Sequence, residues 1–377
     1  MSELRVVLID VISPHKHSSD ALKDLAELQL LVKTFGGVDI VQIIQHRTAP
    51  DQATFIGSGK VQELILIVKQ EKISHLIINS IVSPGQIFNL TKILWSVNPN
   101  IQVWDRVDLI LNIFEKHARS AEAKLQIEIA RMQHMKFRIY GLGGTVLSRQ
   151  AGGIGTRGIG ETNIERMRQH FKKQIKKKKE QLEKLVAHHQ RQFLRRQENG
   201  IKTISIIGYT NAGKTSLFNL LTGKNKQVED ALFVTLDSSV GSLMKQNPQG
   251  SWNPEGSENV VISDTIGFIQ NLPPSLIESF KSTLLEAIEA DILLHIIDLS
   301  DEKMEEKIKA VEEITNDLNL STKKQFYVFN KLDRLNGKVN TIVPKLQEKY
   351  LDFSPLFISV KTSEGIEQLK KQLLQVI

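Results

Sequence analysis

The segment Gly208-Tyr-Thr-Asn-Ala-Gly-Lys-Thr215 decides the fold of the second half of this chain. It has the form GxxxxGK[ST] and follows an apolar run at 203–207, which is the strand–loop–helix context of a phosphate-binding loop. The N–H groups of such a loop form an anion-binding nest, and the next helix directs the positive end of its dipole at the same point. We expect Lys214 to reach the β- and γ-phosphates of a nucleotide and Thr215 to ligate Mg²⁺ through its hydroxyl. The alternative is a glycine-containing turn that binds nothing.

A second string, Asp264-Thr-Ile-Gly267, has the form DxxG and follows the apolar run 260–263. The Asp264 carboxylate is expected to hold Mg²⁺ through water, and the Gly267 N–H to meet the γ-phosphate. An aspartate at the end of a strand is often only a helix cap. Its position after a phosphate-binding loop favours the metal role here.

A third string, Asn330-Lys-Leu-Asp333, has the form NKxD and follows the apolar run 326–329. The Asp333 carboxylate can accept two hydrogen bonds from guanine N1–H and N2–H₂, and adenine lacks this pair of donors. Lys331 can lay its stem against the base while Asn330 braces the loop. Ser359-Val-Lys361, after the apolar run 356–358, would complete the base pocket. The three strings, in this order, predict a site for GTP and GDP.

The switch that senses the γ-phosphate is expected between the first two strings. The candidate is Phe233-Val-Thr-Leu-Asp237, with Thr235 as the second hydroxyl ligand of Mg²⁺, although a threonine there fits a strand equally well. Loss of the γ-phosphate would release this loop. Lys214, Thr235 and Gly267 are the expected catalytic groups. The residues expected to contact the nucleotide are Gly208, Tyr209, Thr210, Asn211, Ala212, Gly213, Lys214, Thr215, Ser216, Phe233, Thr235, Asp264, Gly267, Asn330, Lys331, Asp333, Ser359, Val360 and Lys361.

Two residues refine the expected chemistry. Phe268 stands directly after Gly267, where many small GTPases carry a glutamine that orients the attacking water. Intrinsic hydrolysis should therefore be slow, and a partner or a cation should supply what is missing. Asn211, in the middle of the loop, resembles the asparagine of GTPases that bind K⁺ beside the phosphates. The alternative is an asparagine in an unusual turn conformation.

Composition sets the broad class of the protein. A chain of 377 residues is long for one domain, and 41% hydrophobic residues suffice for real cores. The absence of cysteine excludes disulfides and thiolate metal sites. No apolar stretch approaches the ~20 residues that cross a bilayer. Residues 1–10 carry charges within a short apolar run, so they predict a first strand and no signal peptide. We expect a cytoplasmic monomer with no membrane span.

Residues 1–116 alternate between strand and helix patterns. The runs 5–11, 38–45, 75–79 and 102–104 predict strands, and the segments 19–34, 60–69 and 86–95 have helical apolar spacing. This alternation predicts a small α/β domain with a parallel sheet.

Residues 117–199 have a different pattern, with apolar residues recurring at threes and fours in two long stretches around a glycine-rich loop at 141–160. They predict an antiparallel helical hairpin. The segment holds 19 Lys and Arg against 7 Asp and Glu, a net charge of +12, so the rest of the chain carries −5. Such a block usually has a polyanionic partner. The expected fold is α/β in three parts: an N-terminal α/β domain (1–116), the basic hairpin (117–199), and a P-loop GTPase domain with a mainly parallel sheet (200–377). The apolar stripe of the hairpin is Ala121, Leu125, Ile129, Met132, Met135 and Ile139 with Ile164, Met167, Phe171, Ile175, Leu182, Leu185 and Phe193.

Several longer strings extend these observations over nearly the whole chain. In the nucleotide half they are Leu232-Phe-Val-Thr-Leu-Asp237, Asp264-Thr-Ile-Gly-Phe-Ile269 and Leu272-Pro-Pro. Elsewhere they are Ile56-Gly-Ser-Gly-Lys60 and Leu147-Ser-Arg-Gln-Ala-Gly-Gly-Ile-Gly-Thr-Arg-Gly-Ile-Gly-Glu-Thr162. With the phosphate-binding loop, they resemble the HflX family of ribosome-associated GTPases. Ser238-Ser-Val-Gly241 departs from the Pro-Thr-Thr-Arg usual in that family.

The resemblance implies a factor that binds the large ribosomal subunit and its ribosomal RNA, and that splits stalled or stress-arrested ribosomes under the control of GTP. A basic helical arm with a glycine-rich tip suits a narrow RNA cleft, because Lys and Arg contact phosphates and glycine allows close approach. A solvated helix face is the alternative for the lysines. A GTPase of ribosome assembly, and a GTP-dependent RNA-binding module with negligible turnover, are the competing functions. The expected RNA-contacting residues are Arg149, Arg157, Lys172, Lys173, Lys176, Lys177, Lys178 and Lys179.

Overall fold

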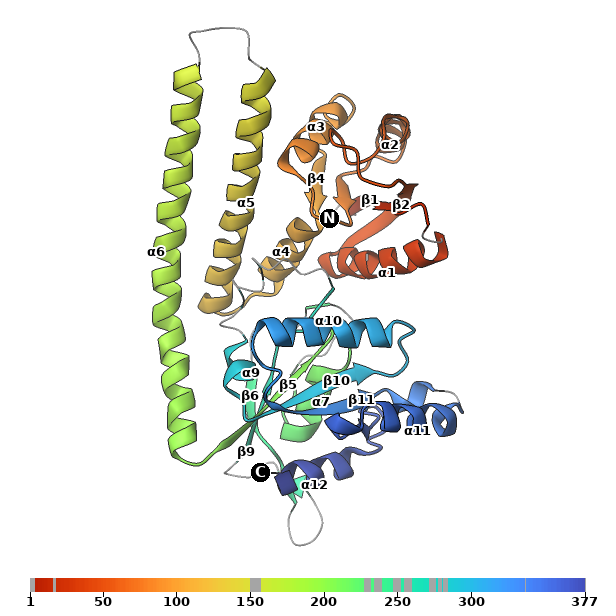
Figure 1. Ribbon diagram of the computed structural model, residues 1–377, viewed down its shortest axis with the longest axis vertical. Helices are drawn as coiled ribbons and strands as arrows, with labels where there is room; N and C mark the ends of the chain where they lie inside the picture. Colours follow the sequence, from red (N-terminus) through yellow and green to blue (C-terminus); the bar gives the residue numbers. More distant parts are fainter. Residues whose placement is uncertain are drawn as a thin grey trace. The chain divides into compact units, whose positions relative to one another are not determined.

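The structure is a computed structural model, and it describes residues 4–15, 18–149, 157–226, 232–233, 239–246, 252–253, 260–270, 276, 280, 284–335 and 337–376. The chain divides into two compact units, each built on its own sheet (Figure 1). The first consists of Met1–Lys116 and Lys124–Leu182, and the second of His117–Ala123 and Glu183–Ile377. Within the described residues, every helix is too short or too polar to cross a lipid bilayer.

The first unit contains a parallel four-stranded sheet in the order β2-β1-β3-β4. Its strands alternate with helices, as the sequence predicts. Val7 and Ile9 of β1 pack with Leu64 of α2 and Leu90 of α3 on one face of the sheet. The elements are β1 (Leu4–Ile12), α1 (Ser18–Phe35), β2 (Gly37–His46), α2 (Ser58–Gln70), β3 (His75–Ile78), α3 (Pro84–Leu94), β4 (Gln102–Asp105) and α4 (Arg106–His117).

The second unit contains a six-stranded sheet in the order β12-β11-β10-β5-β9-β6, parallel except for β6, which runs antiparallel to β9. A short antiparallel pair, β7 with β8, lies outside this sheet. The elements are β5 (Lys202–Gly208), α7 (Lys214–Thr222), β6 (Ser239–Ser242), β7 (Lys245–Gln246), β8 (Trp252–Asn253), β9 (Val260–Asp264), α9 (Leu285–Glu289), β10 (Ile292–Asp298), α10 (Met304–Asp317), β11 (Lys324–Asn330), the 3₁₀ turns Leu332–Arg334 and Leu351–Phe353, α11 (Val339–Lys349), β12 (Leu356–Phe357) and α12 (Ile366–Val376). The predicted α/β class is confirmed.

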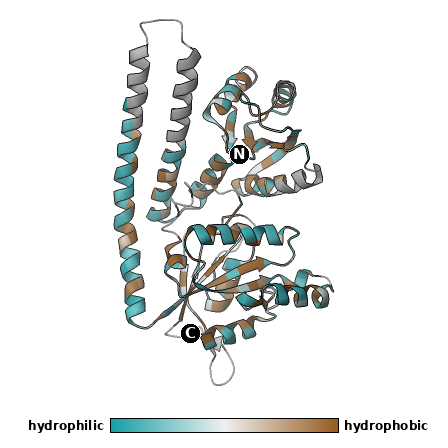
Figure 2. Ribbon diagram, viewed as in Figure 1, coloured by the Kyte–Doolittle hydropathy of each residue, from teal (hydrophilic) through white to brown (hydrophobic). Residues whose placement is uncertain are grey.

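Helices cover both faces of this sheet because its central strands are apolar on both sides. Figure 2 shows the strands as the most hydrophobic part of the unit. Phe218 of α7 and Leu369 of α12 pack on one face, and Ile308 of α10 and Leu346 of α11 on the other. Parallel strands place all their carboxyl ends at one edge, where ligands of open α/β sheets bind. The three predicted strings follow β5, β9 and β11, so all three reach that edge.

The helical hairpin consists of α5 (Ala121–Arg149) and α6 (Arg157–Glu198). Two side-chain pairs join the helices in antiparallel order, Glu128 with Lys178 and Glu122 with His189. The predicted loop at 141–160 is too long, because α5 continues to Arg149 and α6 begins at Arg157. A glycine inside a helix lowers the stability of that helix by about 1 kcal/mol relative to alanine. Adding residues to an existing helix needs no new nucleation step, so the two helices can continue into this segment.

The burial of the hairpin also differs from the predicted stripe. Ile129 and Phe193 are buried as predicted, whereas Met135 and Leu185 are exposed. Ala123, Gln126 and Ala130 are buried although they lie outside the stripe. A helix that packs on more than one side buries more than one stripe of residues. The predicted stripe considered only the contact between the two helices of the hairpin, so it omitted these residues. Ile139, Ile164 and Met167 have side chains outside the described set.

Candidate functional site

The segment 208–215 forms a tight loop between β5 and α7. Gly208, Asn211 and Gly213 all have positive φ angles, of 144°, 62° and 100°. A side chain at Gly213 would collide with the Asn330 amide, so glycine is required there both by conformation and by space. The loop therefore curls at the carboxyl end of the central strand β5, directly before the first turn of α7.

Lys214 is buried beneath this loop. Its ammonium donates a hydrogen bond to the Tyr209 carbonyl oxygen at 2.6 Å. Burial lowers the pKa of Lys214 to about 8, although the nearby Asp264 carboxylate opposes that shift. Gly267 lies against the same ammonium, since a Cβ added to Gly267 would stand 2.8 Å from Nζ. The structure thus brings the first two predicted strings together at Lys214.

Asp264 is fully buried at the end of β9. Its Oδ2 accepts hydrogen bonds from the Thr215 hydroxyl at 3.0 Å and from the Lys226 ammonium at 3.1 Å. Its Oδ1 is buried with no hydrogen-bond donor among the described residues, which is costly for a carboxylate. Carboxylate and hydroxyl oxygens are the ligands that Mg²⁺ prefers. The donor set of Thr215 and Asp264 therefore fits a magnesium ion.

The backbone of Phe268 pairs with the phosphate-loop segment. Its N–H donates to the Gly208 carbonyl oxygen at 3.0 Å, and its carbonyl oxygen accepts from the Thr210 N–H at 2.8 Å. The Phe268 side chain is buried. The position after DxxG is therefore used for packing and for strand-like pairing, and its side chain has no group that can orient water.

The third string is tied to the loop through Asn330, which is buried at the end of β11. Its amide nitrogen donates to the Ala212 carbonyl oxygen at 2.9 Å, and its amide oxygen accepts from the Val360 N–H at 3.1 Å. One side chain thus connects the phosphate loop, β11 and the segment after β12. This is the bracing role that the sequence predicts for Asn330.

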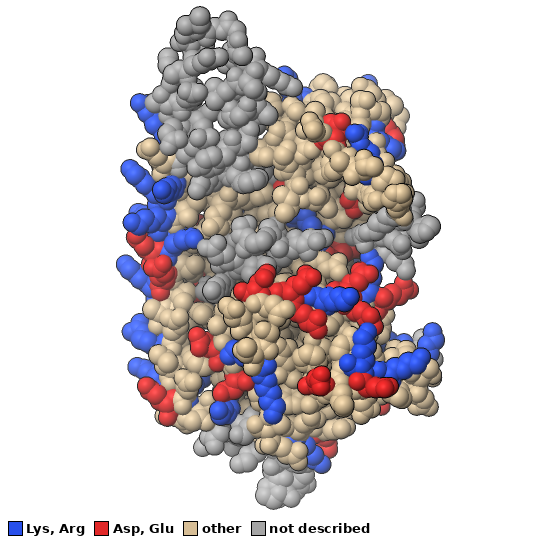
Figure 3. Space-filling model, viewed as in Figure 1, with Lys and Arg blue, Asp and Glu red and all other residues tan. Residues whose placement is uncertain are grey.

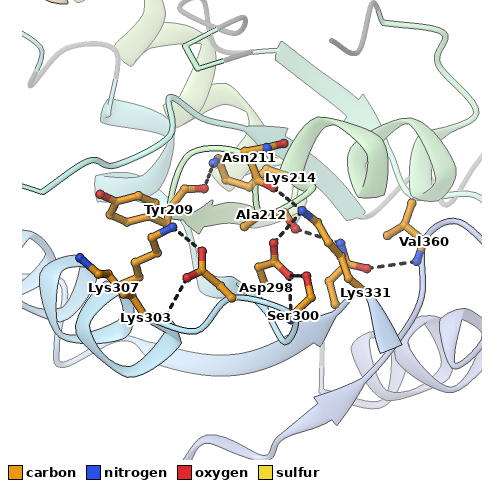
Figure 4. Close-up of polar contacts among 12 residues, drawn as sticks. Tyr209, Asn211, Ala212, Lys214, Asp298, Ser300, Lys303, Lys307, Lys331 and Val360 are labelled. Atoms are coloured by element: carbon orange, nitrogen blue, oxygen red, sulfur yellow. Dashed lines mark hydrogen bonds and ion pairs between the residues drawn. The ribbon is translucent and has the colours of Figure 1, made fainter. Parts of the chain in front are cut away.

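Lys331 connects the end of β10 with the phosphate-binding loop after β5. Its ammonium bonds the Asp298 carboxylate at 2.7 Å and the Asn211 carbonyl oxygen at 2.9 Å (Figure 4). Its φ of 68° lies in the left-handed region, where a lysine is held only by surrounding contacts. The stem of Lys331 is thereby stretched along the edge of the sheet.

Asp333 completes the third string. Its Oδ1 accepts a hydrogen bond from the Ser359 hydroxyl at 2.6 Å. Ser359 is fully buried, and its N–H donates to the Glu364 carbonyl oxygen at 3.0 Å. Lys361, two residues on, is exposed. The segment after β12 therefore contacts Asp333 through Ser359, and its part in a base pocket stays a prediction.

Other predicted residues have mixed outcomes. Asn211 adopts a left-handed turn conformation, and K⁺ binding beside it stays a prediction. Phe233 is buried with a φ of 60°, while Thr235 lies outside the described residues. Tyr209 carries a cation over its ring, since the Lys307 ammonium stands 4.7 Å from the ring centroid (Figure 4).

Two residues of the site, Asp298 and Lys226, were not predicted from the sequence. Asp298 ends the apolar run 292–297 just as Asp264 ends its own strand, so the same rule applied to β10 would have found it. Lys226 follows α7 in a loop with no motif, and only the structure reveals its pairing with Asp264.

The outer face of α6 is basic. Lys172, Lys173, Lys176 and Lys177 are exposed, and Figure 3 shows basic side chains gathered along this helix. The lysine run 176–179 does not lie wholly on this exposed face. Lys178 pairs with Glu128 of α5, and Lys179 is half-buried, because a continuous run of four lysines spans more than one face of a helix. Arg149 and Arg157 stand at the ends of the two helices, with side chains outside the described set.

Three family profiles match consecutive parts of the chain. Residues 22–115 match the N-terminal region of GTP-binding GTPases, and residues 117–196 match the middle region of the same proteins. Residues 203–331 match the 50S ribosome-binding GTPase family.

Curated relatives align over almost the whole chain. GTPase HflX of Caldanaerobacter subterraneus is 40% identical over 97% of this chain and 78% of its own length. GTPase HflX of Escherichia coli is 34% identical over 94% of this chain and 79% of its own length. Among solved structures, the complex of SsGBP with GDP matches with a TM-score of 0.53 and 25% identity, covering 99% of this chain and 98% of that one.

Proposed function

The chain belongs to the HflX family of GTPases and is a GTP hydrolase, and we propose that it binds the large ribosomal subunit and uses its GTP cycle to split or rescue stalled ribosomes. The observation that carries the proposal is that one chain combines two features. The carboxyl edge of its six-stranded sheet has the residues of a guanine-nucleotide site, and its helix α6 has a basic exposed face. The nucleotide edge supplies the switch, and the exposed lysines of α6 supply an RNA-facing surface. We further propose that residues 1–116, 117–199 and 200–377 act as three functional parts.

The proposed roles at the nucleotide follow from the contacts. Lys214 neutralises charge on the β- and γ-phosphates, and the Gly267 N–H meets the γ-phosphate beside it. Asp333 reads the guanine edge while Ser359 holds its carboxylate in place. Asn330 and Lys331 keep the base pocket in register with the phosphate loop, because both side chains bond loop carbonyls directly.

Thr215 and Asp264 would hold Mg²⁺, with Thr235 as a further ligand. When bound, the ion neutralises phosphate charge during transfer to water. Phe268 cannot take the part of a water-orienting glutamine, so the chain by itself lacks one catalytic element. We propose that the ribosome supplies it, with K⁺ held at Asn211 as an additional source of positive charge.

The decisive test is steady-state GTP hydrolysis with and without purified large subunits, in K⁺ and in Na⁺ buffer. We expect a large rise with subunits, which charge reversal at Lys172, Lys173, Lys176 and Lys177 should remove along with most of the salt dependence of binding. Lys345→Glu, at an exposed lysine of α11, is the matched control and should behave like the unmodified chain. Binding that survives the reversal unchanged would refute the role of α6.

A second candidate function has one specific observation in its favour. Phe268 is buried and its backbone is paired with the phosphate loop, which suits a GTP-dependent RNA-binding module with negligible turnover. Normal GTP binding without any rise in hydrolysis on the subunit would favour this function. A role in ribosome assembly would instead appear as preference for assembly intermediates over mature subunits.

A further inference from the structure

Among the residues that the structure describes, a cluster of metal-ligating side chains lies inside the first unit, outside the nucleotide site. Asp105 ends β4, Asp108 lies in the first turn of α4, and His134 comes from α5. One ligand atom from each residue lies within 4.8 Å of the other two. Asp105 is fully buried, and the side chains of Asp108 and His134 are only 15% and 13% exposed.

The Asp105 and Asp108 carboxylates are held in place by hydrogen bonds to each other's backbone, independently of His134. The Asp105 N–H donates to Asp108 Oδ2 at 3.1 Å, and the Asp108 N–H donates to Asp105 Oδ1 at 2.9 Å. This reciprocal cap of α4 uses one oxygen of each residue. It leaves Asp105 Oδ2 and Asp108 Oδ1 directed at the same ring nitrogen, His134 Nε2.

The distances at that nitrogen suit a shared ion. His134 Nε2 stands 3.3 Å from Asp105 Oδ2 and 3.4 Å from Asp108 Oδ1. Ligands placed tetrahedrally around Zn²⁺ at about 2.0–2.2 Å are about 3.3–3.6 Å apart. His134 Nε2 is buried, and both carboxylate oxygens face it. Three ligand atoms thus lie close together around His134 Nε2.

We propose that Asp105, Asp108 and His134 form a binding site for a divalent transition-metal ion, with Zn²⁺ as its probe. One imidazole nitrogen and two carboxylate oxygens favour such ions over Mg²⁺, which prefers oxygen alone. A neutral imidazole leaves two buried negative charges, and a divalent cation balances them. The ion would tie the first turn of α4 to α5 within the first unit.

The alternative to a metal ion is a proton on His134 Nε2, between the two carboxylates. Burial lowers the pKa of His134, but the Asp105 and Asp108 carboxylates outweigh burial and raise it to about 9. A protonated imidazole between two carboxylates would hold α4 and α5 together without any metal. The two occupants respond differently to added Zn²⁺ and to loss of one carboxylate charge.

The experiment uses the full chain saturated with Mg²⁺ and GDP, so that Asp264 is not available to the added ion. Zn²⁺ is titrated by calorimetry, and Co²⁺ is titrated with its visible absorption as the readout. We expect one equivalent of Zn²⁺ and the intense absorption of low-coordinate Co²⁺. Asp108→Asn keeps an oxygen that can cap α4 but removes one ligand, and His134→Gln removes another; each should weaken Zn²⁺ binding by at least about 10-fold.

His189→Gln is the matched control, because His189 is also a hairpin histidine paired with a glutamate, Glu122. It should bind Zn²⁺ like the unmodified chain. Equal Zn²⁺ affinity in the unmodified chain and Asp108→Asn, or a Co²⁺ spectrum of the hydrated ion, would overturn the proposal and leave His134 as a protonated ion pair. Should His134→Gln fail to fold, Asp108→Asn and the Co²⁺ spectrum still decide the question.

Discussion

Two segments of this protein place glycine and lysine at the start of a helix, and only one of them has the geometry of a phosphate-binding loop. Gly208–Lys214 leads from β5 to the first residue of α7, whereas Gly57-Ser-Gly-Lys60 contains the N-cap and first three residues of α2 in the first unit. Gly208 and Gly213 have left-handed φ angles, but Gly57 has an extended φ of −67°. The Gly57 N–H donates to the Gln45 side chain at 2.8 Å, so it is already satisfied by the protein.

The two lysines differ in the same way. Lys214 is buried under its loop, while Lys60 pairs with Glu63 at 2.7 Å on the surface of α2. Composition is therefore a weak guide to anion binding. What matters is a loop that curls at the carboxyl end of a parallel strand and presents a buried cation beneath it.

The largest expected effect comes from replacing each of the two lysines in turn. Lys214→Ala should reduce GDP affinity by about 1,000-fold, because loss of a buried charge partner costs about 3–5 kcal/mol. Lys60→Ala should leave GDP binding unchanged and alter the free energy of unfolding by less than about 0.5 kcal/mol. A fluorescent GDP analogue measures the affinity. Equal losses in the two variants would refute the distinction drawn between the loops.

A second change tests the opposite end of the nucleotide edge. Asp333→Asn should reduce GTP affinity by about 100-fold or more, since the amide oxygen can replace one acceptor only and the amide NH₂ then faces a donor of guanine. It should raise affinity for xanthosine triphosphate, whose base offers an acceptor where guanine has an amino group. Asp352→Asn, at an exposed carboxylate, is the control. Competition binding with the three nucleotides measures the preference, and unchanged GTP selectivity would contradict the assignment of Asp333.

The same contrast explains how far the sequence could predict the structure. Gly208–Thr215, Asp264 and Asn330–Asp333 were identified because their chemistry requires fixed residue types after successive strands. Ser359-Val-Lys361 was placed beside the base pocket because it follows the next strand in the same sheet, but the hydrogen bond from Ser359 to Asp333 was not foreseen. The pairing of Lys178 with Glu128 and the cluster of Asp105, Asp108 and His134 were missed. These contacts join residues far apart in the chain, and their positions depend on how helices pack, which no local pattern encodes.

The smallest expected effect is the pH dependence of GDP affinity that follows from the burial of Lys214. Because burial lowers the pKa of Lys214 to about 8, its ammonium loses its proton within the range of ordinary buffers. Only the protonated form attracts phosphate, so GDP affinity should fall as pH rises, by about fourfold between pH 7 and pH 8.5. Binding of guanosine, which lacks phosphates, corrects for titration of the base over the same range. A GDP profile that follows the guanosine profile would mean that Lys214 stays protonated throughout. Lys214 would then differ from a surface lysine in its contacts but not in its charge.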